Sequence, residues 1–194
     1  MYTVIGTTRS RTFRVLWMLE ELSQPYEHLP YAPRAPEVLA KNPTGKVPVL
    51  LDGDQTLTDS VAIMTYLADK HGNLTAPAGT IARARQDAMA LWLIDEMDAL
   101  LWAAAKHSFI LPEEQRQPAV KDCLKAEFRA NAEALSAKLN GPFLIGEQFS
   151  LPDILAVHCL NWSVGAKFPR LPDKLHKYAK RLRERPAYRT AFER

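Results

Sequence analysis

The sequence predicts an α/β unit followed by an all-helical region, arranged as two small domains within 194 residues. Three observations support this fold class. Short apolar runs typical of strands alternate with helical periodicity before Asn73. The stretch "NLTAPAGT", from Asn73 to Thr80, is typical of a linker. All that follows carries apolar stripes at helical spacing.

The first part of the chain predicts the order β-α-β-α-β-β-α. Apolar residues at helical spacing from Phe13 to Leu19 predict the first helix, and Pro25 lies beyond its end. Asp52-Gly53 is typical of a hairpin turn, and Gly72 is placed to cap the last helix. The predicted strands are Tyr2–Gly6, Tyr26–Tyr31, Val47–Leu51 and Thr56–Thr58, and the helices are Arg11–Leu22, Glu37–Lys41 and Ser60–His71.

The second part predicts three long helices, at 81–106, 120–139 and 150–164. The third is almost wholly apolar and is therefore expected to be buried. Its start carries two signals of a rigid helix entrance. Ser150 and Asp153 form a capping-box pattern, and Phe149 and Ile154 occupy the positions of a hydrophobic staple.

Composition limits the classes of function. A net charge of +3 is too small to indicate nucleic-acid binding, and the basic stretch 174–189 has the helical spacing of a solvated helix face. No apolar run approaches the roughly 18 residues of a membrane span, and the start of the chain lacks a secretory pattern. Cys123 and Cys159 lie far apart, which fits a reducing cytoplasm.

Pro48 lies between Val47 and Val49, within a segment that otherwise predicts a buried strand. A trans proline here would only remove a hydrogen bond from the sheet, as on an edge strand. A cis Val47–Pro48 bond would instead turn the chain and leave the Val47 N–H and C=O facing outward. Those two groups would then pair with the backbone of a bound peptide.

Asp59-Ser60 stands at the start of the last predicted helix of the first part. Ser60 can cap this helix, and its free N–H groups form a site for an anion. The Asp59 carboxylate beside that site can hold an ammonium group. An ordinary helix cap would explain the same pair. Together with the Val47–Pro48 motif, however, the pair describes a pocket for a short peptide with a free amino-acid end.

Three segments carry a resemblance that extends in order over the whole chain. "NPTGKVPVLLDGDQTLTDSVAIMTYLADK" resembles the glutathione-binding segment of cytosolic glutathione transferases. "TFRVLWMLEELSQPYE" resembles their first helix and second strand, and "LIGEQFSLPDILAV" resembles their buried capping-box helix. The resemblance implies a thioredoxin-like domain at 1–74, a linker at 75–80 and a helical bundle domain at 81–194. It also implies glutathione as co-substrate and a homodimer.

The same resemblance assigns the glutathione contacts. Val47, after the cis Pro48, would pair with the cysteinyl backbone, and Asp59 and Ser60 would hold the γ-glutamyl end. Lys46 precedes them in the Gly-Lys-Val-Pro pattern. Most classes of the family have Glu or Gln where Asp59 stands, so the shorter Asp59 side chain implies a shorter reach toward the ligand here.

Members of this family place a Ser, Cys or Tyr near the end of the first strand, where it donates to the glutathione sulfur. The segment here is "GTTRSRTFRV", and counting back from Val15 puts the usual position on Arg9, with Ser10 one residue later. Ser10 is the candidate, since it precedes the first helix, whose N–H groups stabilise a thiolate. A simple helix cap would explain Ser10 equally well. Arg9 and Arg11 can lower the thiol pKa, and Thr7 and Thr8 are further alternatives.

The resemblance therefore predicts a transferase that activates the glutathione thiol for conjugation to a small hydrophobic electrophile. A glutathione-dependent isomerase, dehalogenase or peroxide and disulfide reductase would use the same site. A non-enzymatic glutathione- or partner-binding module is a further alternative. Trp102 and Phe109 are candidates for the second-substrate pocket. The five histidines lack metal-ligand spacing, so no metal is expected and His158 is expected to be a core residue.

Overall fold

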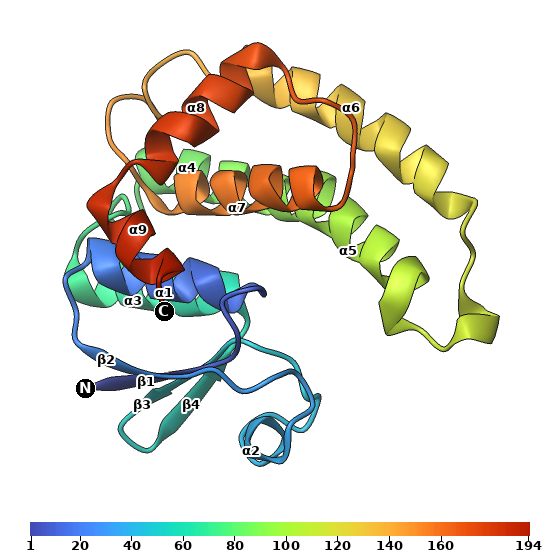
Figure 1. Ribbon diagram of the computed structural model, residues 1–194. Helices are drawn as coiled ribbons and strands as arrows, with labels where there is room; N and C mark the ends of the chain where they lie inside the picture. The colour runs from blue at the N-terminus through green and yellow to red at the C-terminus, as the bar shows by residue number, and fades with distance from the viewer. The chain divides into compact units, whose positions relative to one another are not determined.

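A computed structural model describes residues 1–194, which form two compact units. The first unit contains residues 1–83 together with 183–194, and the second contains residues 84–182. The helices and strands of both are labelled in Figure 1. The sequence placed 183–194 with the helical domain, whereas here these residues group with the first unit.

A four-stranded sheet forms the centre of the first unit. Its strands lie in the order β2-β1-β3-β4, with β1 and β2 parallel and the other two pairs antiparallel. The third strand starts two residues later than predicted, after Pro48, because proline cannot donate to the ladder. The strands are β1 (Tyr2–Ile5), β2 (Tyr26–Leu29), β3 (Val49–Asp52) and β4 (Gln55–Thr58).

Both faces of this sheet are covered. Since side chains alternate along a strand, the paired Val4 and Leu50 point to one face and the paired Ile5 and Val49 to the other. Helices α1 (Thr12–Glu21) and α3 (Ser60–His71) lie on the same face (Figure 1). On the other face, Ile5 and Val49 pack against Val38 of α2 (Pro36–Leu39).

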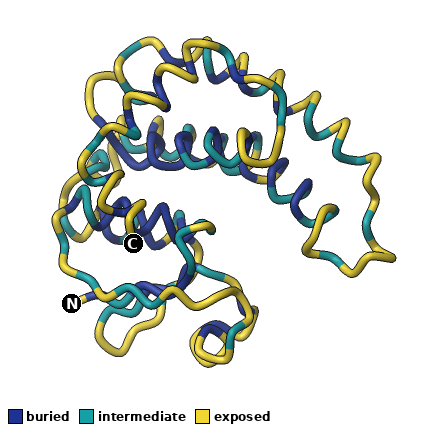
Figure 2. The backbone as a smooth tube through the Cα atoms, in the orientation of Figure 1, coloured by how far each residue is buried: buried dark blue, intermediate teal, exposed yellow.

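Helix α1 is the buried element of this unit, and Figure 2 shows it dark blue along most of its length. Every residue from Thr12 to Leu19 is buried. Helix α9 (Pro186–Phe192) covers α1 within the same unit. The Tyr188 ring meets Phe13 and Trp17 edge-on, at centroid distances of 5.1 and 4.9 Å.

The second unit is entirely helical. The continuous helix predicted at 81–106 extends to Ile110 and contains two π-helical segments, which the apolar pattern did not reveal. None of the helices in the structure is both long and apolar enough to cross a membrane. The elements are α4 (Ile81–Leu93), η1 (Ile94–Asp98), α5 (Ala99–Ala105), η2 (Lys106–Ile110), the 3₁₀ turn η3 (Glu113–Gln115), α6 (Val120–Lys138), α7 (Leu151–Gly165) and α8 (Asp173–Arg183).

Helix α7 is the core of this unit, and its first seven residues are all buried. The capping box predicted from Ser150 and Asp153 is present at its start. Helix α7 packs against η1 and α5, and α6 packs against the same two elements. Asn131 on α6 donates to the backbone carbonyl of Glu96 in η1 at 2.8 Å, so one carbonyl of the π-helical segment is satisfied by a side chain.

Candidate functional site

Strand pairing brings the two sequence motifs of the first unit side by side. Val47–Pro48 directly precedes β3, whose first residue, Val49, pairs with Thr58 at the end of β4. Asp59 and Ser60 follow Thr58, so they lie at the same end of this hairpin (Figure 1). Two segments separated by the β3–β4 hairpin therefore meet at one edge of the sheet.

Val47 presents an unpaired piece of backbone to this edge. Its side chain is half-buried, and neither its N–H nor its C=O forms a hydrogen bond within the chain. The Val47–Pro48 peptide bond is cis. A residue with a free donor and a free acceptor can pair with one residue of a peptide as a strand does.

The loop before Val47 is held by the buried Asn42. Its side-chain amide donates to the Lys46 carbonyl at 2.9 Å, and its Oδ1 accepts from the Thr44 amide and hydroxyl at 3.2 and 2.9 Å. These bonds fix the conformation of the loop that leads into Val47. The side chain of Lys46 remains exposed.

A third segment, the turn between β1 and α1, reaches the site at Gly6, which directly follows β1. Its φ is +135°, and a Cβ built there would lie 2.8 Å from the Val47 Cβ and 2.1 Å from the Thr12 Oγ1. A larger residue at this position would clash with both. Glycine therefore allows the start of α1 to lie close to Val47, a proximity that sequence spacing did not indicate.

Asp59, rather than Ser60, caps α3. Its Oδ1 accepts from the amides of Val61 and Ala62 at 2.8 and 3.1 Å, so the expectation that Ser60 caps this helix was wrong. Asp59 is exposed and has a φ of +70°, which is unfavourable for a residue with a side chain. Its second carboxylate oxygen, Oδ2, stays available for a cation.

Ser60 is 2% exposed, and its Oγ accepts a hydrogen bond of 3.2 Å from Nη1 of Arg14 on α1. Because the oxygen is the acceptor here, the hydroxyl proton remains available for another acceptor. The Ser60 amide, at the first position of α3, forms no hydrogen bond within the chain. Two donors of one residue can thus bind an anion at a helix N-terminus.

Arg14 is a contributor to this site that the sequence did not reveal. It is fully buried, although it belongs to the same apolar helix as Val15 and Leu16. A charged residue on the buried face of a helix was the available signal, since such a residue requires a polar partner.

Ser10 lies in the turn that leads into α1. Its hydroxyl is 2.7 Å from the Thr7 carbonyl and 2.9 Å from the Thr12 Oγ1, and it accepts from the Thr12 amide at 3.1 Å. The hydroxyl therefore has acceptors for its proton within the turn. It is half-buried at the N-terminus of α1, where the helix dipole favours negative charge.

The other candidates for thiol activation surround Ser10. Arg9 is exposed, whereas Arg11, Thr7 and Thr8 are half-buried. Both guanidinium groups thus belong to the β1–α1 turn, which reaches Val47 through Gly6.

The two candidates for the second-substrate pocket belong to the second unit. Trp102 is half-buried on α5, and Phe109 lies on η2 with 67% of its surface exposed.

Comparison with protein families identifies two matching regions. Residues 6–75 match the glutathione S-transferase N-terminal domain, and residues 97–186 match the glutathione S-transferase C-terminal domain. Together these regions include every residue of the site described above.

Individual relatives match over different lengths. Glutathione S-transferase GstB of Escherichia coli K12 is 31% identical over 205 residues, covering 97% of this chain and 96% of its own. Human glutathione S-transferase theta-1 is 36% identical over 132 residues, covering 64% of this chain. The match thus spans just over half, 55%, of the length of this theta-1 relative.

Two solved structures share the fold over nearly the whole chain. A theta class glutathione S-transferase from Xanthomonas axonopodis pv. citri, with glutathione bound, is 28% identical, with 98% of this chain and 96% of that chain covered and a TM-score of 0.80. BphK, a bacterial GST in a ternary complex, is 21% identical, with 98% of each chain covered and a TM-score of 0.88.

Proposed function

Because the chain belongs to the glutathione S-transferase family, we propose that it binds glutathione and activates the thiol for conjugation to a small hydrophobic electrophile. The observation that carries the proposal is the Val49–Thr58 pair. It holds the unpaired Val47 backbone beside the Asp59-Ser60 helix start, which suits a peptide with a free α-amino acid end.

Each part of glutathione has a partner of matching chemistry in this proposal. The Val47 N–H and C=O pair with the cysteinyl unit. The amide and hydroxyl of Ser60 donate to the γ-glutamyl carboxylate, while Asp59 Oδ2 accepts from the ammonium group. Lys46, exposed beside Val47, adds positive charge for a glutathione carboxylate.

Activation of the thiol is assigned to the start of α1. When glutathione binds, the Ser10 hydroxyl turns from its acceptors within the turn and donates to the sulfur. Arg9 or Arg11 adds positive potential that favours the thiolate. The thiolate then attacks the electrophilic carbon. A sulfur–carbon bond forms, the leaving group departs with its electron pair, and the thiol proton passes to solvent.

The proposal also includes the larger organisation expected from the sequence. Residues 1–74 bind glutathione, and residues 81–194 supply the pocket for the electrophile, with Trp102 and Phe109 among its walls. A homodimer, a cytoplasmic location and a role in detoxification complete it. Light scattering of the purified chain tests the dimer.

Retention on immobilised glutathione, followed by turnover with a panel of aryl halides, epoxides and peroxides, tests the function. We expect elution by free glutathione and conjugate formation with at least one carbon electrophile. Retention without any turnover would instead assign a binding module. Lack of retention by a folded chain would overturn the proposal.

A further inference from the structure

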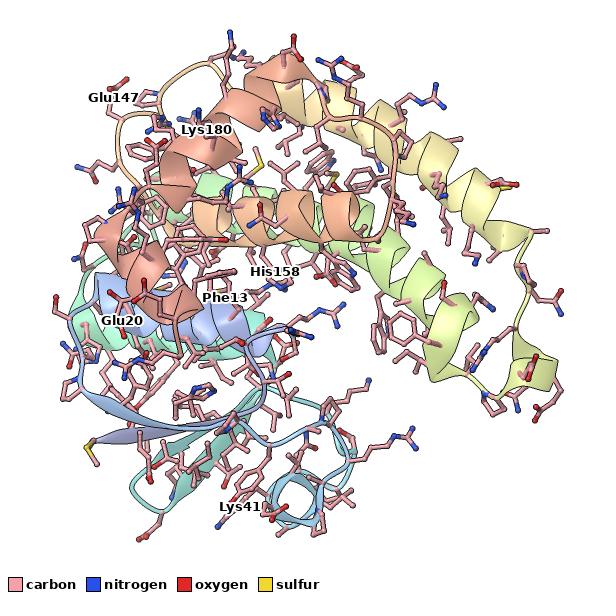
Figure 3. All side chains as sticks on the ribbon, in the orientation of Figure 1. Phe13, Glu20, Lys41, Glu147, His158 and Lys180 are labelled. Carbon is pink, nitrogen blue, oxygen red and sulfur yellow. The ribbon has the colours of Figure 1, made fainter.

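Three metal-ligating side chains gather in the second unit, outside the proposed glutathione site. Asp98 is the last residue of η1, and His158 and Cys159 are consecutive residues of α7 (His158 is labelled in Figure 3). One ligand atom from each of the three lies within 4.8 Å of the other two. Asp98 and His158 are 60 positions apart, which explains why sequence spacing gave no sign of the cluster.

Two of the three groups are enclosed by the core. Asp98 is 4% exposed and Cys159 is fully buried, while His158 is half-buried and borders solvent. Asp98, His158 and Cys159 also make interactions within the chain, so the case for an ion depends on how closely their ligand atoms gather. The half-buried imidazole leaves an approach for an ion from solvent.

The backbone at Asp98 is itself unusual. Residues Ile94–Asp98 form a π-helical segment, in which an extra residue in the turn changes the direction of the side chains that follow. Such segments are frequent at functional sites. This one packs against α7, the helix that carries His158 and Cys159.

We propose that Asp98, His158 and Cys159 bind one Zn²⁺ ion. A thiolate, an imidazole and a carboxylate are the ligand types that zinc takes in proteins, and three protein ligands leave a fourth position for water. Hard cations such as Mg²⁺ disfavour the thiolate. Bound there, the ion would join η1 to α7 and stabilise the second unit.

Cobalt titration of the full-length protein, after treatment with a chelator, provides the direct test. Co²⁺ replaces Zn²⁺ in such sites, and a thiolate ligand gives a charge-transfer band in the near ultraviolet. We expect this band in the wild type and its loss on addition of Zn²⁺. Cys159→Ser should abolish the band, and Asp98→Asn and His158→Gln should weaken cobalt binding by more than about tenfold.

Matched controls separate this site from other cysteines and histidines. Cys123→Ser removes the exposed cysteine of α6, and His176→Gln removes an exposed histidine of α8. Both should keep the band and the rise in Tm that Zn²⁺ causes. Circular dichroism checks the fold of each variant, and Asp98→Asn preserves side-chain volume if Cys159→Ser proves unstable.

The opposite results would overturn the proposal. They are an absent thiolate band in the wild type, a band that survives Cys159→Ser, or one that disappears in Cys123→Ser. In each case the three side chains interact only with one another and with their neighbours. Retention on glutathione is measured in parallel, so that failure of zinc binding is distinguished from failure of the proposed function.

Discussion

At the scale of single residues, Asp59 combines two tasks with its two carboxylate oxygens. Oδ1 accepts from two amides of the first turn of α3, and Oδ2 remains for a ligand cation. Asparagine caps helices about as well as aspartate but lacks the charge. Asp59→Asn therefore separates the two tasks.

We expect Asp59→Asn to weaken glutathione binding by about ten- to a hundredfold, the loss of one charge-assisted bond of about 1.5–3 kcal/mol. The Tm should stay close to that of the wild type because the cap is kept. Calorimetric titration with glutathione measures the affinity. Asp54→Asn, an exposed acid in the β3–β4 turn, is the control, and equal affinities in the two variants would contradict the assignment.

Ser10 is the residue for which the thiol pKa is the decisive measurement. We expect Ser10→Ala to bind glutathione but to raise the pKa of the bound thiol, so that turnover falls at neutral pH and partly recovers at alkaline pH. Thiolate absorbance of bound glutathione against pH measures this. A pKa that moves in Arg9→Ala or Arg11→Ala, but not in Ser10→Ala, would transfer the role to that arginine.

The sequence indicated which segments form the candidate site, but it did not indicate which role each residue has there. Asp59-Ser60 was recognisable as a helix start, yet either side chain can cap, and the positive φ that directs Asp59 is a property of the folded turn. The contact from Arg14 to Ser60 joins residues 46 positions apart. Local patterns carry no information on such a pairing.

At the scale of elements, the start of α7 depends on one buried carboxylate. Asp153 accepts from the Ser150 and Leu144 amides at 2.9 Å each and from the Tyr178 hydroxyl at 2.6 Å. Burial raises the pKa of Asp153, and the bond from Tyr178 is the largest influence that opposes the rise. Asp153 therefore joins the α7 start to α8 within the second unit.

We expect Tyr178→Phe to lower the free energy of unfolding by about 1–3 kcal/mol. It should also raise the pKa of Asp153 further, because an opposing hydrogen bond is lost. A carboxyl whose folded pKa exceeds its unfolded value contributes stability at low pH, and this contribution is lost as pH rises through the folded pKa. The loss in free energy of unfolding caused by Tyr178→Phe, relative to the wild type, should therefore grow with rising pH. It should level off once Asp153 has lost its proton in both folded proteins.

Urea unfolding over a pH series measures this deficit. Tyr31→Phe, at an exposed tyrosine, is the control. In an Asp153→Asn background, the pH dependence of the Tyr178→Phe effect should vanish. A deficit that is independent of pH would contradict the role of Asp153.

Sequence patterns predicted this capping box because its residues are three positions apart and interact locally. The π-helical segments η1 and η2 were not predictable in the same way. Their extra residues disturb the 3.6-residue period only slightly, and η1 is held by a long-range bond from Asn131 to Glu96.

At the scale of the whole molecule, helix α9 returns to the first unit. Arg185 binds Glu21 of α1 through two contacts, with Nε 2.5 Å from Oε1 and Nη2 2.7 Å from Oε2, and the Glu21 side chain is 7% exposed. Trp17 Nε1 donates to the same carboxylate at 2.9 Å. Glu20, the neighbour of Glu21 on α1 and labelled in Figure 3, accepts a hydrogen bond from the Tyr26 hydroxyl.

We expect Arg185→Ala to destabilise the protein by about 1.5–3 kcal/mol, since it leaves a mostly buried carboxylate without its cation. Hydrogen exchange of the α1 amides should quicken, while exchange in α6 should change little. Arg189→Ala, at an exposed arginine of the same helix, is the control and should affect neither. Equal destabilisation by the two variants would contradict the stabilising role of the Arg185–Glu21 pair.

The division into an α/β part and a helical part was predictable because hydrophobic periodicity differs between them. The return of 183–194 was not, since an amphipathic helix pattern identifies a buried face without naming the element that covers it. Tyr188, whose ring meets both Phe13 and Trp17, shows how this depends on tertiary packing.

This return has a consequence for synthesis on the ribosome. Chains emerge N-terminus first, and a domain made of one continuous segment can fold as soon as that segment is released. Here α1 receives its cover of Tyr188 and Arg185 only after the whole of the second unit has been translated. Until then the aromatic face of α1 lacks this cover, so the nascent first unit exposes apolar surface for longer than its position in the chain implies.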